Sequence, residues 1–297
     1  MRVIGYYKSF DRQEAITSID LDALTHLDYA FLLPIEDGSV YFKNESNVKK
    51  VVELCHEKGI KAYVSVGGAC DGNIILSNVF EKICDSEESI KRFVSNVMKV
   101  VDDFGFDGID IDWEYPWIDY KDKFESLISL FKEKVDEKNK GLTIAIHRAI
   151  EGEWKFNRLA SITDRVIEMV DWLNIMTYDD TKSENHSSIE LANHSLKYWN
   201  EIRKVPKDKL LIGIPFYARP SEKPYYKIIE ESDKNAFYDY WDEDSYNGIY
   251  TVKQKVLLGK EYGGIIIWAI NFDADKENEY SLLNEIEYLS KNDDKKA

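Results

Sequence analysis

The stretch DGIDIDWEYP, residues 107–116, places four acidic side chains within eight positions of an otherwise apolar segment. Three of them, Asp110, Asp112 and Glu114, fall at every second residue. Because successive side chains of a β-strand point to opposite faces, these three carboxylates share one face and the apolar residues between them share the other. The stretch therefore predicts a strand with one acidic and one apolar face.

Seven further runs rich in β-branched or aromatic residues lie along the chain. Most runs are separated by charged stretches with helical period, such as EESIKRFVSNVMKVVDDF at residues 87–104. This alternation indicates parallel strands joined by helical crossovers, and eight such units in about 300 residues predict an α/β fold, the (β/α)8 TIM barrel. The eight runs are residues 3–7, 26–33, 61–68, 108–114, 142–148, 172–179, 210–219 and 263–273.

A doubly wound open sheet is the alternative with the same alternation. That fold usually carries a glycine-rich phosphate-binding turn after its first strand. Here the sequence GYYKSF, residues 5–10, occupies this place, which favours the barrel. In a barrel, the apolar face of residues 108–114 packs under the helices and the acidic face points inward, with Glu114 at the carboxyl end where barrel enzymes hold their active sites.

One connection departs from the alternation. Residues 220–250 are rich in Tyr, Glu and Asp, show no clear period and lie between the seventh and eighth predicted strands. We predict a short loop insertion at the carboxyl end of the barrel, where connecting loops build active sites. The insertion is too short to form a domain of its own, so residues 1–297 are expected to form a single catalytic domain.

Composition narrows the class of partner. The 297 residues carry a formal net charge of −16, which repels nucleic acid phosphates and anionic lipids. No apolar run approaches the ~18 residues needed to cross a bilayer. We expect a monomer that binds a neutral or cationic molecule, with neither nucleic acid nor membrane as partner. The protein is expected in the cytoplasm if Met1 is the natural start, and outside the cell if a signal peptide was trimmed.

Three carboxylates on one strand face indicate acid–base chemistry. Like charges this close cannot all ionise readily, so at least one pKa should rise, as a general acid at neutral pH requires. A purely structural role is one alternative, although burying three carboxylates is costly. A divalent metal site is another, but such sites usually include histidine, and His147 ends a different predicted strand. We therefore expect neither a metal nor another cofactor.

The motif DGIDIDWE resembles the DxxDxDxE signature of family 18 of the glycoside hydrolases, the chitinases and their relatives. Asp107, Asp110, Asp112 and Glu114 occupy its acidic positions. Other segments resemble family motifs in the family's order across nearly the whole chain, namely SVGG at residues 65–68, MTYD at 176–179, GIPFYAR at 213–219 and Trp268. The resemblance implies the barrel fold and a glycan-cleaving activity.

The resemblance also implies a mechanism. The family cleaves β-1,4 linkages next to N-acetylglucosamine with retention, and the substrate's own 2-acetamido oxygen attacks the anomeric carbon. Glu114 would be the general acid and later the base that activates water. Asp112 would orient the acetamido group and stabilise the charged intermediate, Asp110 would share a proton with it, and Tyr178 would donate its hydroxyl to the acetamido oxygen. Asp107, of opposite parity, is predicted to be structural.

A sugar site also needs flat rings for the apolar faces of pyranoses and polar groups for their hydroxyls. By resemblance, Trp268 would form the floor under the distorted sugar. Tyr217 and Arg219 would contact the sugar or the intermediate, and Asp179 would contact the sugar. The residues that match family positions of this subsite are Tyr7, Phe31, Tyr115, Met176, Asp179, Tyr217, Arg219 and Trp268.

Several of these residues have an equally good structural explanation. Tyr7, Phe31 and Met176 would serve as well in the barrel core. At the end of the fifth predicted strand, where the resemblance leads us to expect smaller and less charged residues, His147 and Arg148 would mark an altered subsite. Aromatic residues on predicted loops either bind outer sugars or pack their own loops, and these are Trp117, Trp154, Tyr225, Tyr226 and Trp241.

Two functions compete with that of a chitinase. The first is a non-catalytic chitinase-like lectin, but such relatives typically replace the final Glu of the motif, and Glu114 is present. The second is an endo-β-N-acetylglucosaminidase that acts on N-glycans or peptidoglycan-type glycans, a choice that the loops decide. We predict a retaining, substrate-assisted hydrolase whose partner is a chitooligosaccharide or a related N-acetylglucosamine glycan.

Overall fold

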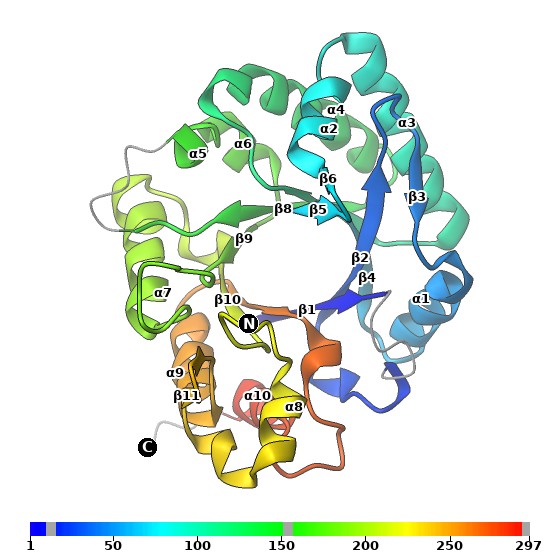
Figure 1. Ribbon diagram of the computed structural model, residues 1–297. Helices are drawn as coiled ribbons and strands as arrows, with labels where there is room; N and C mark the ends of the chain where they lie inside the picture. The colour runs from blue at the N-terminus through cyan, green and yellow to red at the C-terminus, as the bar shows by residue number, and fades with distance from the viewer. Residues whose placement is uncertain (10–15, 151–156, 293–297) are drawn as a thin grey trace. The chain divides into compact units, whose positions relative to one another are not determined.

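The computed structural model describes residues 1–9, 16–150 and 157–292. Hydrogen bonding within this part of the chain orders eight strands as β1-β13-β10-β9-β8-β7-β4-β2, and β1 also pairs with β2 (Figure 1). This order closes the strands into a ring, which confirms the predicted (β/α)8 TIM barrel. The strands are β1 (Arg2–Lys8), β2 (His26–Pro34), β4 (Lys61–Gly68), β7 (Gly108–Trp113), β8 (Gly141–His147), β9 (Leu173–Met176), β10 (Leu210–Pro215) and β13 (Gly264–Trp268).

The helix predicted at residues 87–104 is α3 (Glu87–Phe104), with the same bounds. It begins where the Ser86 side chain accepts a hydrogen bond from the Ser89 backbone N–H, and it ends at Gly105, which adopts a φ of +79°. The other α-helices of the described residues are α1 (Val48–Glu57), α2 (Leu76–Ile83), α4 (Lys121–Asp136), α5 (Asn157–Ala160), α6 (Asp164–Met169), α7 (Ile189–Leu196), α8 (Tyr225–Glu231), α9 (Ile249–Lys260) and α10 (Leu282–Lys291).

Two connections differ from the sequence prediction. Residues 220–250, predicted as a loop, contain α8 and a hairpin of β11 (Tyr240–Trp241) and β12 (Asp244–Ser245). Helix α8 has only seven residues, too few for a visible period, although Tyr225, Ile228 and Ile229 bury one face. In the described part of the β1–β2 connection, residues 16–25, the helical residues are all of the 3₁₀ type, at 16–17 and at Leu21–Ala23, where a full crossover helix was expected.

Three further short strands extend the loops. β3 (Val40–Phe42) pairs antiparallel with β2, and β5 (Cys70–Asp71) pairs antiparallel with β6 (Ile74–Ile75) directly after β4. Within the described residues, no helix is both long enough and apolar enough to cross a membrane. The β5–β6 hairpin lies in a connection that follows the carboxyl end of a barrel strand, where barrels build their sites.

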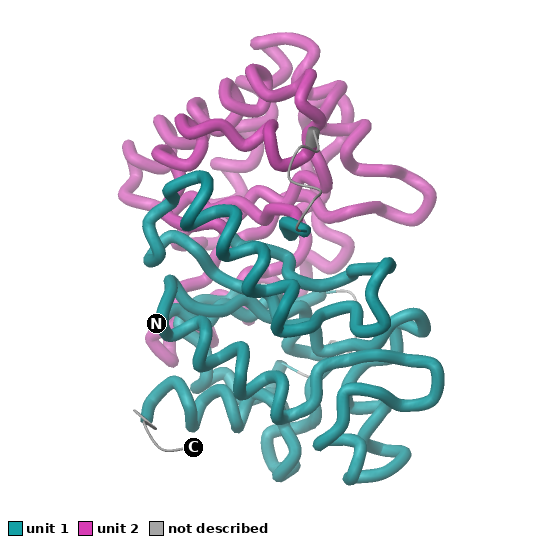
Figure 2. Tube along the Cα trace, turned by 90° about the vertical axis from the view of Figure 1, so that its left-hand side faces the viewer, with its two compact units in different colours: residues 1–27, 148–150, 174–297 teal, residues 28–147, 151–173 magenta. Residues whose placement is uncertain are grey.

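The chain divides into two compact units, coloured separately in Figure 2. Unit 1 comprises residues 1–27, 148–150 and 174–297, and unit 2 comprises residues 28–147 and 151–173. Unit 1 contains the parallel pairs of β13 with β1 and with β10, and unit 2 contains those of β7 with β4 and with β8. A single catalytic domain stays a prediction.

The apolar face of β7 is buried, as its parity predicts. Ile109, Ile111 and Trp113 are at most 1% exposed. The Trp113 ring stacks on Phe80 of α2 with ring centroids 5.0 Å apart, and its Nε1 donates to Ser77 Oγ at 2.8 Å. Packing this face against a helix turns the acidic face of β7 away from it, because the two faces of a strand are opposed.

Candidate functional site

Asp110 is the first member of the acidic row, which consists of Asp110 and Asp112 on β7 and of Glu114 directly after it. In the strand register it pairs with Ser65 on β4 and with Thr143 on β8. Both hydroxyls donate to its carboxylate, Ser65 Oγ to Oδ2 at 2.9 Å and Thr143 Oγ1 to Oδ1 at 2.8 Å. Donors on both oxygens stabilise the ionised form of this fully buried side chain. Thr143 escaped the sequence analysis because only the register reveals it.

Asp112 behaves differently from its neighbour. It is 4% exposed, and its Oδ1 has no hydrogen-bond partner among the described residues. Burial raises the pKa of Asp112 well above its usual value, and the charges of Glu114, Asp110 and Asp28 raise it further. The raised pKa favours the protonated form of Asp112 more strongly than in a free carboxyl group.

Asp28 is an acidic residue that the sequence analysis missed. It lies on β2 and is 1% exposed. Its charge acts on Asp112, so it belongs to the same acidic cluster. A signal existed, because Asp28 interrupts the apolar run HLDYAFLL at residues 26–33 as the carboxylates interrupt β7.

Glu114 directly follows the carboxyl end of β7 and is half-buried. The next residue, Tyr115, packs edge-on against the His147 ring, with centroids 4.7 Å apart. The Arg158 guanidinium lies 5.1 Å from the Tyr115 ring centroid and 5.0 Å from that of Trp117. Trp117 is 45% exposed, and Trp154, the other tryptophan proposed for outer sugars in this part of the sequence, lies outside the described residues.

The SVGG motif explains how β4 approaches the acidic row. Gly67 adopts a φ of +125°, and a Cβ at this position would lie 2.1 Å from the Asp112 carbonyl oxygen. A Cβ on Gly68, at φ +95°, would lie 2.8 Å from the Phe31 ring. Both conformations favour glycine, and both glycines admit a close neighbour. The motif is therefore required by the backbone that carries Asp112.

Gly67→Ala is expected to destabilise the fold by about 2–5 kcal/mol, because it adds a positive-φ penalty to a steric clash with β7. Gly59→Ala is the matched control, since Gly59 adopts a φ of +72° with no atom within 4 Å of the added Cβ. Urea denaturation of both variants measures the difference. Equal losses of unfolding free energy in the two variants would show that the close approach of β7 to Gly67 adds nothing to the cost of the substitution.

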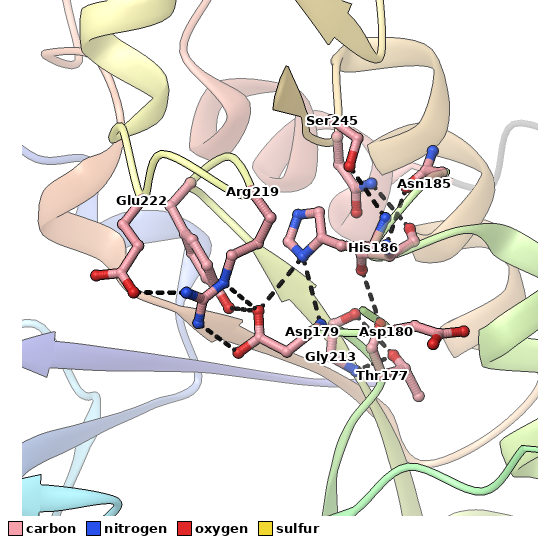
Figure 3. A network of polar contacts seen from close by, with 12 residues as sticks. Thr177, Asp179, Asp180, Asn185, His186, Gly213, Arg219, Glu222 and Ser245 are labelled. Carbon is pink, nitrogen blue, oxygen red and sulfur yellow. Dashed lines mark hydrogen bonds and ion pairs between the residues drawn. The ribbon is translucent and has the colours of Figure 1, made fainter. Parts of the chain in front are cut away.

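Asp179, in unit 1, is held by two residues of the predicted sugar site (Figure 3). Tyr217 Oη donates to its Oδ1 at 2.6 Å, and Arg219 donates from Nε to Oδ1 at 2.8 Å and from Nη2 to Oδ2 at 2.9 Å. We call these three residues the Asp179 cluster. Burial alone would raise the pKa of Asp179, but hydrogen bonds from His186, Arg219 and Tyr217 hold it well below its usual range.

The Asp179 cluster bears on the predicted sugar contacts. Both carboxylate oxygens of Asp179 already accept hydrogen bonds, and the hydroxyl of Tyr217 is already donated. The remaining terminal nitrogen of Arg219, Nη1, donates to Glu222 Oε1 at 2.5 Å. A direct contact between Asp179 and the sugar stays a prediction, and in this structure the carboxylate fixes the orientation of Tyr217 and Arg219.

His186 lies next to the Asp179 cluster. The sequence did not reveal it, because it stands in a polar stretch that matches no motif. It is 2% exposed, and its Nδ1 lies 3.3 Å from the Asp179 backbone N and 3.4 Å from Asp179 Oδ1 (Figure 3). Burial lowers the pKa of His186, which favours the neutral ring. Its Nε2 has no hydrogen-bond partner among the residues that the structure describes.

Tyr178 and Trp268 lie at the carboxyl ends of two strands of unit 1. The Tyr178 ring is 7% exposed and contacts the Tyr217 ring edge-on at 6.3 Å. It also packs on Gly213 of β10, where a Cβ would lie 2.6 Å from a Tyr178 ring carbon. Trp268 is half-buried and meets the ring of Tyr6 edge-on at 5.8 Å.

The remaining candidates divide between core and surface. Tyr7 is fully buried and Met176 is 7% exposed, so both fill the interior in this structure, and their contact with a sugar stays a prediction. Tyr225 is also buried, and its hydroxyl donates to the Tyr280 carbonyl at 2.9 Å, so it packs its own loop. The Trp241 ring is half-buried with Lys223 Nζ 3.6 Å from its centroid.

Among the described side chains, no group of three or more His, Cys, Asp or Glu could hold a metal ion.

Comparisons with known proteins agree with these motifs. The family model described as glycosyl hydrolases family 18 matches residues 2–273. A putative chitinase 1 of Margaritifera margaritifera is 28% identical over 249 residues, and the match covers 73% of this chain and 52% of that protein. The chain thus spans about half the length of this relative.

Solved structures show the same fold. A chitinase from the chitin utilization locus of Flavobacterium johnsoniae is 28% identical, with a TM-score of 0.84 over 97% of this chain and 93% of that chain. A chitinase-like agglutinin of Robinia pseudoacacia is 20% identical, with a TM-score of 0.80 over 96% of this chain and 98% of that chain, which shows a shared fold alone. Because the family model covers nearly the whole sequence, the chain belongs to family 18 of the glycosyl hydrolases.

Proposed function

We propose that this chain hydrolyses β-1,4 linkages next to N-acetylglucosamine, in chitooligosaccharides, with retention and with the substrate's acetamido oxygen as nucleophile. The observation that carries the proposal is the acidic row of β7. It ends in a half-buried Glu114 and contains Asp110, which accepts two hydroxyl hydrogen bonds, beside a buried Asp112 of raised pKa. Membership of family 18 supports the same assignment.

The row supplies the acid–base chemistry. Glu114 protonates the leaving oxygen and then accepts a proton from the attacking water. Asp112 offers an oxygen without a partner among the described residues to the acetamido N–H. As positive charge forms on the cyclising acetamido group, it lowers the pKa of Asp112, and the row then stabilises that charge. Asp110, fixed by two hydroxyls, accepts the shared proton.

The other family motifs supply groups for the sugar. Tyr178 donates its hydroxyl to the acetamido oxygen and directs it toward the anomeric carbon. The half-buried ring of Trp268 packs on the apolar face of a pyranose. Tyr217 and Arg219, oriented by Asp179, bind the hydroxyls or the intermediate. Each of these roles is a proposal that follows the family motifs residue by residue.

Glu114 also favours a hydrolase over a lectin. A lectin needs rings and hydrogen-bonding groups, but it does not need a carboxyl group that transfers a proton at the end of the acidic row. A fold shared with an agglutinin leaves this question open, because fold alone does not decide function. Glu114, together with the raised pKa of Asp112, is the feature that separates the two.

A panel of fluorogenic substrates tests the proposal. We expect release of the fluorophore from chitobiose and chitotriose conjugates and little from N-glycan or muropeptide conjugates. Turnover of the N-glycan or muropeptide conjugates alone would identify the endo-acting alternative. Binding of chitotriose without turnover of any conjugate would contradict the hydrolase and support the lectin.

A further inference from the structure

Lys255, on α9, is a fully buried lysine that the proposed mechanism does not use. Its Nζ lies 2.6 Å from Ser187 Oγ, 2.8 Å from Asn247 Oδ1 and 3.4 Å from the Gly213 carbonyl oxygen. An ammonium group has three donors, and the structure provides three acceptors. Each donor of the charged form of Lys255 therefore has an acceptor within reach.

Each acceptor is connected by hydrogen bonds to the backbone near Tyr178. Ser187 Oγ donates to the Thr177 carbonyl at 2.7 Å, so it links Lys255 to the residue before Tyr178. Gly213 exchanges two hydrogen bonds with the Thr177 hydroxyl, at 2.8 and 2.9 Å, and also lies against the Tyr178 ring. Asn247 Nδ2 donates to the Ser187 carbonyl at 2.9 Å. Lys255 thus links two backbone segments. One contains Thr177, the residue before Tyr178, and the other contains Gly213, which lies against the Tyr178 ring.

This arrangement is costly for stability. Burial lowers the pKa of Lys255 to about 7, although the negative charges of Asp239 and Glu190 act in the opposite direction. Lys255 in turn contributes to the lowered pKa of His186. No carboxylate hydrogen-bonds to Lys255 among the described contacts, so a buried apolar side chain would cost less. A costly buried charge next to a candidate site residue points to a functional role.

We propose that Lys255 is a positioning residue that orients the Tyr178 hydroxyl by fixing the Thr177 and Gly213 carbonyls. The inference rests on the proposed function, because it gives Tyr178 its task. Lys255 does not reach the substrate. It acts through the Ser187 hydroxyl and the Gly213 backbone, and its loss leaves Tyr178 present but less well oriented.

Lys255→Met tests this proposal, because Met fills similar volume without donors. We expect kcat on the chitotriose conjugate to fall about 10- to 100-fold with little change in KM, because orientation matters most in the transition state. Lys253→Met, on the same helix but only half-buried, is the control and should retain wild-type kcat. In a Tyr178→Phe background, Lys255→Met should have almost no further effect on kcat. Fully additive losses would contradict action through Tyr178.

The pH dependence gives a readout that a merely structural lysine would not produce. The ratio of wild-type to Lys255→Met kcat should decline toward one as pH rises through about 7, because the wild type then loses its ammonium group. Stability should change the other way. The folded-state pKa lies below the unfolded value of about 10.4, so the unfolded chain binds the extra proton between these values. Wild-type stability relative to Lys255→Met should therefore rise from pH 7 to pH 10. A ratio of wild-type to Lys255→Met kcat that stays constant as pH rises through about 7 would overturn the proposal.

Hydrogen exchange separates this inference from the proposed function. In Lys255→Met, backbone amides of the peptide around residues 173–180 should exchange about tenfold faster than in the wild type, while those of α3 stay unchanged. Unchanged exchange at residues 173–180 would overturn the positioning role even in an active enzyme. Faster exchange in a protein without hydrolase activity would remove the proposed function and leave the support of this segment by Lys255 standing.

Discussion

Glu114→Gln is expected to fold like the wild type and to lose hydrolysis of chitotriose conjugates by about 10²- to 10⁴-fold. The amide preserves the shape of the side chain and removes the proton that the leaving oxygen needs. Binding of chitotriose, measured by calorimetry, should survive, because the rings and hydrogen-bonding groups of the site are unchanged. Wild-type turnover in this variant would overturn the assignment of Glu114 as the acid.

Asp107→Asn is the matched control, because Asp107 belongs to the same motif and lies outside the acidic row. Its carboxylate accepts from the Ala62 backbone N–H at 2.9 Å and contacts His56 and Lys61 at 3.0 and 3.3 Å. Burial favours its protonation, but these hydrogen bonds and charges hold the pKa of Asp107 below its usual value. The variant should lose stability and keep kcat. An equal loss of kcat in both variants would mean that the motif acts only through the fold.

The strands could be predicted from the sequence because their signal is local. A run such as residues 108–114 alternates between buried apolar and acidic residues, and each position follows from its parity alone. Helix α3 shows an 18-residue amphipathic pattern between a Ser cap and a Gly stop, so its bounds could be predicted as well. The sequence signal of such regular elements is local, so it can be recognised without knowing their packing partners.

The partners of buried polar groups could not be predicted in this way. Asp110 bonds to Ser65 and Thr143, which are 45 and 33 residues away in the sequence, because three parallel strands share a register. Lys255 bonds to Ser187, 68 residues away, and sequence patterns carry no trace of that contact. The acidic motif therefore identified the chemistry of the site, but the groups that set the pKa and orientation of its members required the folded chain.

Asp179 illustrates the same limit for a residue that the motif did identify. The sequence places it next to Tyr178 and predicts a contact with the sugar. The structure adds a φ of +62° and a carboxylate that already accepts from Tyr217 and Arg219. Such a carboxylate stabilises the orientation of two cationic or hydroxyl donors, a role that residue identity alone does not reveal.

The largest discrimination is expected between substrates with and without the acetamido group. A glucose oligomer matched in length to chitotriose lacks the proposed nucleophile, so it should not be cleaved at a measurable rate even where it binds. Asp112 and Tyr178 would also lose their partners in that complex, and unpaired polar groups of this kind give discrimination of about 10⁴- to 10⁵-fold. Turnover of both oligomers, followed by release of reducing ends, measures the ratio.

An inhibitor and a covalent trap then decide which atom attacks. A thiazoline analogue of the cyclised intermediate should inhibit strongly, because it resembles the species that the acidic row is proposed to stabilise. If Asp110 or Asp112 attacked directly, a 2-fluoro sugar should leave a covalent adduct that mass spectrometry detects. An adduct on either residue, together with no inhibition by the thiazoline, would replace the substrate's acetamido oxygen with an enzyme carboxylate while leaving the barrel and Glu114 in their places.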